Sequence, residues 1–232
     1  MRVIEQTQPS GAPRCRRGSL RPKLGRVTRR LKRSTAGTAL IEFAVALPVF
    51  IVLGMYGTEL AYMATVNMEV SQLANSVADN ASRLGQTDNS SVTPTVTETD
   101  VDSVMEGALR QGSGIDFQEK GRIILTSLER DSDTGEQYIH WQRCRGGLDE
   151  DSSYGAEGDV VADGMGKDDR EITAPANSAV MFAEVYYNYD GIFGDMFVGD
   201  VLFKQEAAFI VRDDRNLGPG VTGTGGNSSC TS

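Results

Sequence analysis

Two hydrophobic patterns follow one another near the start of the chain, and the first is a continuous apolar run. Residues 39–58 read ALIEFAVALPVFIVLGMYGT, with one charged residue. As a helix rising about 1.5 Å per residue, this run crosses the roughly 30 Å hydrocarbon core of a bilayer. The pattern therefore predicts one transmembrane helix. One alternative is a buried helix of a soluble domain. The other is a cleaved signal peptide, which is disfavoured because no A-x-A-like cleavage site follows the run.

The second pattern continues the helix over residues 59–84. Apolar residues three and four positions apart form one stripe along its surface: Met63, Val66, Val70, Leu73, Val77, Ala81 and Leu84. Since no Gly/Pro cluster separates the two patterns, they predict one spine helix over 38–84, kinked at Pro48. We favour packing of the stripe against the protein's own domain over packing against a partner helix, and the two are compatible.

The pattern after the spine helix is typical of a small α+β domain. A polar linker over 85–98 precedes a short helix over 99–111, with Thr99 or Asp100 as its N-cap and Gly112 as its stop. Four strand candidates follow, the first two joined by a hairpin turn: 121–129, 137–144, 179–189 and 201–212. An antiparallel sheet packed on the amphipathic half of the spine helix would bury their apolar faces.

Two Gly-rich segments belong to the same region. Residues 145–176 are rich in Gly and Asp and are expected to form a long, mobile loop. Residues 216–232 are expected to form a Gly-rich tail. The domain itself is therefore assigned to 99–215.

Charge is distributed unevenly along the chain, whose net charge is −9. Residues 1–37 hold 11 Lys and Arg against one acid, Glu5, whereas the remainder holds 12 against 31. A Lys/Arg excess before a span keeps that end in the cytoplasm. We therefore interpret 1–37 as a cytoplasmic leader and place the acidic remainder across the membrane. Its charge would repel a phosphate backbone, so nucleic acid is not an expected partner.

One carboxylate lies inside the apolar run. Placing a charged side chain at mid-bilayer depth costs about 2.5–3.5 kcal/mol of free energy, and less near an edge. The presence of Glu42 in the apolar run therefore calls for an explanation. Glu42 is the fifth residue after Gly37, and Phe43 follows it within the string RRLKRSTAGTALIEFAVALPVF. This string resembles the processing site of type IV pilin-like proteins, and its form is most similar to the TadE-like minor pseudopilins of tight adherence (Flp) pilus systems. The resemblance covers residues 29–84.

The resemblance implies a function and a set of partners. A prepilin peptidase would cut between Gly37 and Thr38, and Glu42 would face the N-terminal amine of a neighbouring subunit, with Phe43 packing beside it. The chain would then be a bacterial inner-membrane protein with a periplasmic domain, working with other pilin subunits and a pilus assembly platform. The alternatives are an unprocessed, signal-anchored binding or enzyme domain and a type II secretion pseudopilin.

The remaining candidate chemistry is sparse. Cys144 and Cys230 lie on the side predicted to be exported, where a disulfide can form, and we favour that bridge over two free thiols. His140 lies between Ile139 and Trp141 in a predicted strand, so a structural role is favoured over a general base. The DSDTGE string at 131–136 is closer to a hairpin turn than to a calcium loop. No enzymatic activity, metal or cofactor is therefore expected.

Overall fold

The computed structural model describes residues 36–85, 93–167, 170–212 and 215–230. The chain divides into two compact units, Met1–Leu53 and Gly54–Ser232. Most of the leader and the middle of the linker lie outside the described residues. The predictions made for them are therefore not addressed by the structure.

The spine helix is present as α2 (Ala36–Ser82), with Pro48 inside it. Its ends lie two residues before those predicted. In the N-terminal unit the apolar side chains are exposed; Leu40 is 71% and Phe50 70% accessible. Among the described residues, α2 is the one helix long and apolar enough to cross a membrane, and none of its most apolar stretch is buried by the protein. An exposed apolar surface of this size is typical of a helix that faces a membrane or another protein.

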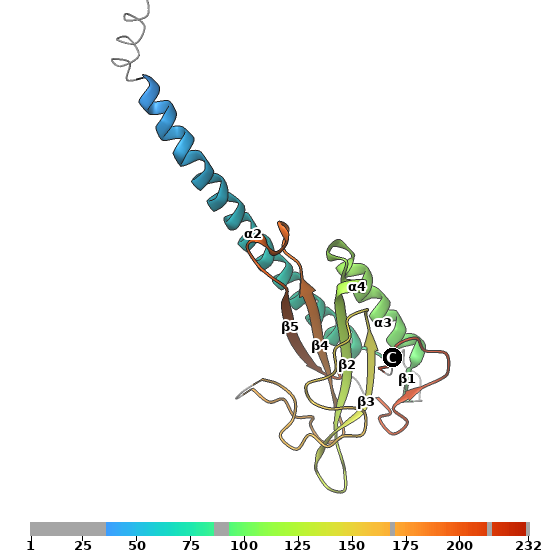
Figure 1. The fold of residues 1–232 in the computed structure, drawn as a ribbon. Helices are drawn as coiled ribbons and strands as arrows, with labels where there is room; N and C mark the ends of the chain where they lie inside the picture. Colours follow the sequence, from blue (N-terminus) through green and yellow to red (C-terminus); the bar gives the residue numbers. More distant parts are fainter. Residues whose placement is uncertain (1–35, 86–92, 168–169, 213–214, 231–232) are drawn as a thin grey trace, which may run out of the picture. The chain divides into compact units, whose positions relative to one another are not determined.

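Four strands of the described chain form one antiparallel sheet, shown in Figure 1. They are β2 (Gly121–Arg130), β3 (Gln137–Arg145), β4 (Ala179–Tyr189) and β5 (Val201–Ile210), in the order β3-β2-β4-β5. Each strand begins at the residue predicted and ends within two residues of the prediction. The α+β fold class is confirmed.

One face of the sheet packs on helices. The second half of α2 and the helix α3 (Glu98–Gln111) cover it, and together they form the main core. The predicted stripe supplies the α2 side of this core: Val66, Val70, Leu73, Val77 and Ala81 are buried, and Met63 and Leu84 pack against them. The stripe therefore packs against the protein's own domain, as expected.

The opposite face of the sheet is covered by the long β3–β4 loop. Met165 and Ala174 from this loop are buried against Val180 and Phe182 of β4. Consequently β2 and β4 are buried along almost their whole length, rather than at alternate positions. In its described residues the loop forms turns and isolated β-bridges, and its packing on the sheet was not predicted.

Short elements complete the fold. The chain between α3 and β2 forms the turns η1 (Gly112–Ile115) and α4 (Phe117–Lys120), and η2 (Gly194–Met196) lies between β4 and β5. β1 (Val96–Thr97) pairs in parallel with β6 (Val221–Thr222). The segments expected to be only a linker and a tail therefore each contribute a strand.

The start of α3 differs from the prediction. The N-cap is Thr97, not Thr99 or Asp100. Thr97 Oγ1 accepts a hydrogen bond from the Asp100 backbone N–H (3.2 Å), and Asp100 Oδ2 accepts one from the Thr97 N–H (3.1 Å). This capping box satisfies two donors that a helix start otherwise leaves free, which is why the helix begins at Glu98.

Candidate functional site

The residues predicted for processing and assembly occupy the first two turns of α2. Gly37 lies just after the helix start, and the space around its Cα is open, with no atom within 4 Å of the position a Cβ would take. Glu42 and Phe43 are both exposed. The structure thus presents these side chains on the outside of an apolar helix. The roles given to Gly37, Thr38, Glu42 and Phe43 stay predictions.

A second carboxylate of the same helix has the opposite environment. Glu59 follows the apolar run directly and is completely buried. Its Oε1 accepts hydrogen bonds from Tyr189 Oη (2.6 Å) and the Ile192 N–H (3.1 Å), and its Oε2 accepts one from the Phe193 N–H (3.1 Å). Burial of a carboxylate is costly unless hydrogen bonds replace its water. We call Glu59, Tyr189, Ile192 and Phe193 the Glu59 cluster.

The Glu59 cluster ties the β4–β5 loop to the helix at a point where a Cβ would crowd its neighbours. A Cβ on Gly191 would lie 2.9 Å from Glu59 Oε1 and 3.0 Å from the Gly194 carbonyl oxygen. The Tyr56 and Phe197 rings add a contact with their centroids 5.9 Å apart. Sequence reasoning missed this cluster. Its one local signal was a carboxylate placed directly after an apolar run.

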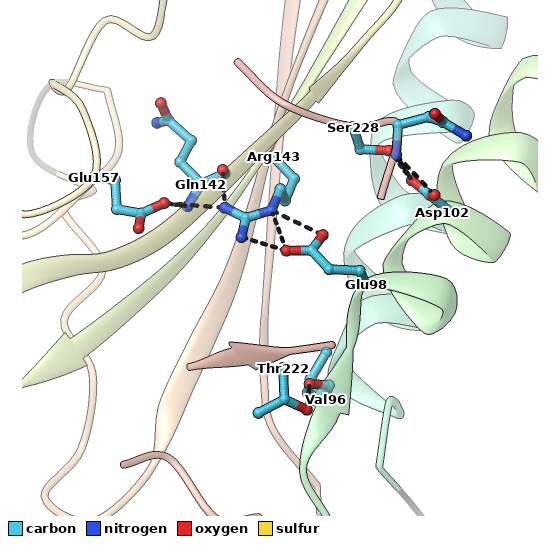
Figure 2. A network of polar contacts seen from close by, with 9 residues as sticks. Val96, Glu98, Asp102, Gln142, Arg143, Glu157, Thr222 and Ser228 are labelled. Atoms are coloured by element: carbon cyan, nitrogen blue, oxygen red, sulfur yellow. Dashed lines mark hydrogen bonds and ion pairs between the residues drawn. The ribbon is translucent and has the colours of Figure 1, made fainter. Parts of the chain in front are cut away.

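A polar network joins β3 to the start of α3 (Figure 2). Arg143 donates to both carboxylate oxygens of Glu98, from Nη2 to Oε1 at 2.6 Å and from Nε to Oε1 and Oε2 at 3.2 and 3.1 Å. Its Nη1 also donates to Glu157 Oε2 at 3.0 Å, in the β3–β4 loop. A two-bond guanidinium–carboxylate pair restrains orientation as well as distance. Arg143 therefore holds a strand, a helix and a loop together.

The same region holds the C-terminal tail. Asp102 of α3 accepts a hydrogen bond from the Asn227 N–H (3.0 Å). It also accepts one from Ser228 Oγ, and both of these residues are labelled in Figure 2. Cys144 and Cys230 form a disulfide with their Cα atoms 4.6 Å apart. The Cys144 N–H donates to the Ser228 carbonyl oxygen at 2.8 Å. The last described residues are thus fastened to both α3 and β3.

His140 occupies an irregular position in β3. Ser127 pairs with Trp141 and Leu128 with Ile139, so His140 is the extra residue of a β-bulge. Its Nδ1 lies 2.8 Å from Glu129 Oε2. This hydrogen bond raises the pKa of His140 above its ordinary value, although burial opposes the shift. The arrangement matches the structural role favoured from the sequence.

The DSDTGE string forms the hairpin turn between β2 and β3. Asp131 Oδ1 accepts hydrogen bonds from the Asp133 N–H (2.8 Å) and the Thr134 N–H (2.7 Å), which is the usual role of Asp in a turn. Within the described ranges, no group of three or more His, Cys, Asp or Glu residues is arranged to hold a metal ion.

These features define a class of protein: within the described residues, one helix is long and apolar enough to span a membrane and continues into the core of an α+β domain. Comparison with protein families narrows the class, because residues 37–82 match the family described as TadE-like protein. The match coincides with α2 and confirms the resemblance, which points to a protein associated with Tad pili. Neither the curated proteins nor the solved structures provide a match.

Proposed function

We propose that this protein is a minor pilin-like subunit, cut by a prepilin peptidase between Gly37 and Thr38, that takes part in assembling an adhesive Flp/Tad-type pilus. The observation that carries the proposal is the TadE-like match over the helix that exposes both its apolar surface and Glu42. A carboxylate in such a surface is suited to a charged partner within the membrane rather than to lipid.

The proposed topology places the N-terminus in the cytoplasm and the domain in the periplasm. The Lys/Arg excess of residues 1–37 supports this orientation, because positively charged flanks are retained on the cytoplasmic side. The disulfide between Cys144 and Cys230 supports it independently, since such bonds persist in the periplasm and are reduced in the cytosol. The membrane is then the bacterial inner membrane.

Cutting after Gly37 would connect processing to assembly. It would create a positively charged α-amino group on Thr38, four residues before Glu42. In the proposed assembly, this amine of one subunit neutralises Glu42 of the next, which offsets the cost of keeping a carboxylate at membrane depth. The other expected partners are the pilin subunits and the assembly platform.

N-terminal sequencing of the protein extracted from native membranes tests the processing step. We expect the mature chain to begin at Thr38, and Gly37→Leu to leave the leader attached because the added side chain blocks a tight protease cleft. An intact leader on the wild-type protein would contradict the proposal and favour a signal-anchored domain.

Variants of Glu42 test the assembly step. Glu42→Ala should leave membrane insertion intact yet reduce the number of pili seen by electron microscopy. The matched control is Glu69→Ala, which removes a carboxylate from the same helix beyond the apolar run. Normal piliation in Glu42→Ala would contradict the assigned role.

A further inference from the structure

The β4–β5 loop, residues 190–200, carries apolar side chains that the domain leaves uncovered. Met196 is 70% and Ile192 49% accessible. On the neighbouring turns of α2, Tyr56 and Leu60 are exposed as well. An exposed apolar patch beside a membrane-spanning helix requires an explanation that isolated surface residues do not.

The position of the loop along α2 is set by direct contacts. The Phe197 ring packs on Tyr56, and the Ile192 and Phe193 N–H groups bind Glu59. All of these residues belong to the C-terminal unit. Residues 56–59 are the end of the apolar run and the first position after it. The loop therefore lies within about one helical turn, 5.4 Å, of the end of the span.

That level corresponds to the interfacial zone of a bilayer. The hydrocarbon core is about 30 Å thick and the whole bilayer about 40–45 Å, which leaves several ångströms of interface on each side. Trp and Tyr are enriched in this zone, and elements that lie on a membrane bury Trp, Phe and Leu side chains in it. Tyr56, Phe193 and Phe197 would give the domain such an aromatic layer.

We infer that the β4–β5 loop inserts Ile192 and Met196 into the interfacial zone of the bilayer crossed by α2, as a second membrane contact. The inference rests on the membrane span in the proposed function, but not on processing or pilus assembly. A loop at the membrane interface would also explain the role of Glu59. Backbone N–H groups near hydrocarbon must be satisfied within the protein, and the Glu59 carboxylate satisfies those of Ile192 and Phe193.

The charge of the loop identifies the kind of contact. Residues 190–200 contain Asp190, Asp195 and Asp200 and no Lys or Arg. Asp190 is paired with Lys120, Oδ2 to Nζ at 2.8 Å. Anionic headgroups would therefore not attract the loop, and the contact is hydrophobic. Vesicles of zwitterionic lipid should support it, with little effect of salt.

Tryptophan quenching in reconstituted full-length protein tests the inference. Met196→Trp is placed in phosphatidylcholine vesicles containing phosphatidylcholine brominated on its acyl chains, with the wild type as the baseline for the native Trp141, which is buried. We expect the emission added by Met196→Trp to be largely quenched. Val160→Trp is the matched control, since Val160 is also exposed but lies in the β3–β4 loop, and its added emission should persist.

Phe50→Trp, within the span, separates the possible failures. If Phe50→Trp is quenched but Met196→Trp behaves like Val160→Trp, the loop contact is overturned and the span stands. An unquenched Phe50→Trp overturns the span, the proposed function and the loop contact together. Met196→Trp emission that is unquenched and blue-shifted only at high protein-to-lipid ratio assigns the patch to a second copy of the chain, which also overturns the loop contact.

Discussion

Glu42 and Glu59 show how the surroundings of one side chain determine its use. Both belong to α2, yet Glu42 is exposed in an apolar surface, whereas Glu59 is buried with three hydrogen-bond donors. A satisfied carboxylate contributes to the architecture of its own chain. An exposed one at membrane depth is available to another chain.

Gly191 should be more sensitive to a methyl group than its neighbour in the same loop. Gly191→Ala places a Cβ against Glu59 Oε1 and the Gly194 carbonyl, so we expect a loss of about 1–2 kcal/mol in the free energy of unfolding. Gly199→Ala is the control, because no atom lies within 4 Å of its added Cβ. Denaturant unfolding and hydrogen exchange at the Ile192 and Phe193 amides measure the difference. Equal stability and exchange in both variants would show that the Glu59 cluster does not constrain the loop.

The bulge residue His140 should make stability depend on pH. Its pKa is raised by Glu129, with a smaller contribution from Glu157. The stabilisation is therefore complete below the unfolded value of about 6.5 and is lost as pH rises through the higher folded value. We expect the melting temperature of the wild type to fall relative to His140→Gln between pH 6 and pH 9. A constant difference between the two proteins over that range would contradict this assignment.

At the scale of elements, the C-terminal tail has an anchoring role. It pairs with β1, binds Asp102 of α3 and reaches Cys144 of β3 through the disulfide. At the edge of β3 that faces away from β2, the Cys144 N–H donates to the tail at Ser228, and the Ile139 N–H donates to the β3–β4 loop at Asp159. An edge strand covered in this way has fewer free backbone groups to pair with other chains.

Removing the disulfide should weaken this anchoring measurably. The bond closes a sequence separation of 86 residues, and loss of such a bridge costs about 2–4 kcal/mol. The free energy of unfolding of the variant Cys144→Ala/Cys230→Ala should be lower by that amount, so the variant should unfold at a lower denaturant concentration. Reductant should lower the stability of the wild type in the same way and leave the double variant unchanged. If reductant has no effect on the wild type, the bridge is not a stabilising element.

Elements with local signals could be predicted from the sequence, and contacts over long sequence separations could not. The strand starts were correct because turn residues mark them, as at Gly121. The start of α3 was misassigned because the string VTETD offers several capping residues, and the pairing of β1 with β6 extends the strand to Thr97. The Glu59 cluster was missed because Tyr189 is 130 residues away. The hydrophobic periodicity of a sequence does not predict a contact between two residues that far apart.

At the scale of the molecule, one helix belongs to two environments. Its N-terminal part exposes apolar side chains to the surroundings, and its C-terminal part is a component of the domain core. Solubility should therefore be determined by the first part. We expect a fragment covering 54–232 to remain in solution without detergent and to unfold cooperatively, whereas the full chain requires detergent. Aggregation of the fragment during centrifugation and gel filtration would contradict this division.

The depth at which α2 enters the domain also has a mechanical consequence. One face of the helix is buried from Val66 to Ala81, and Arg215 donates hydrogen bonds to the Ala81 and Leu84 carbonyl oxygens at its end (2.9 and 2.7 Å). Tension applied along the helix would load these contacts together, in shear, rather than peel them apart one by one. A force that pulls the N-terminal end of α2 would therefore carry the folded domain with it as a single load.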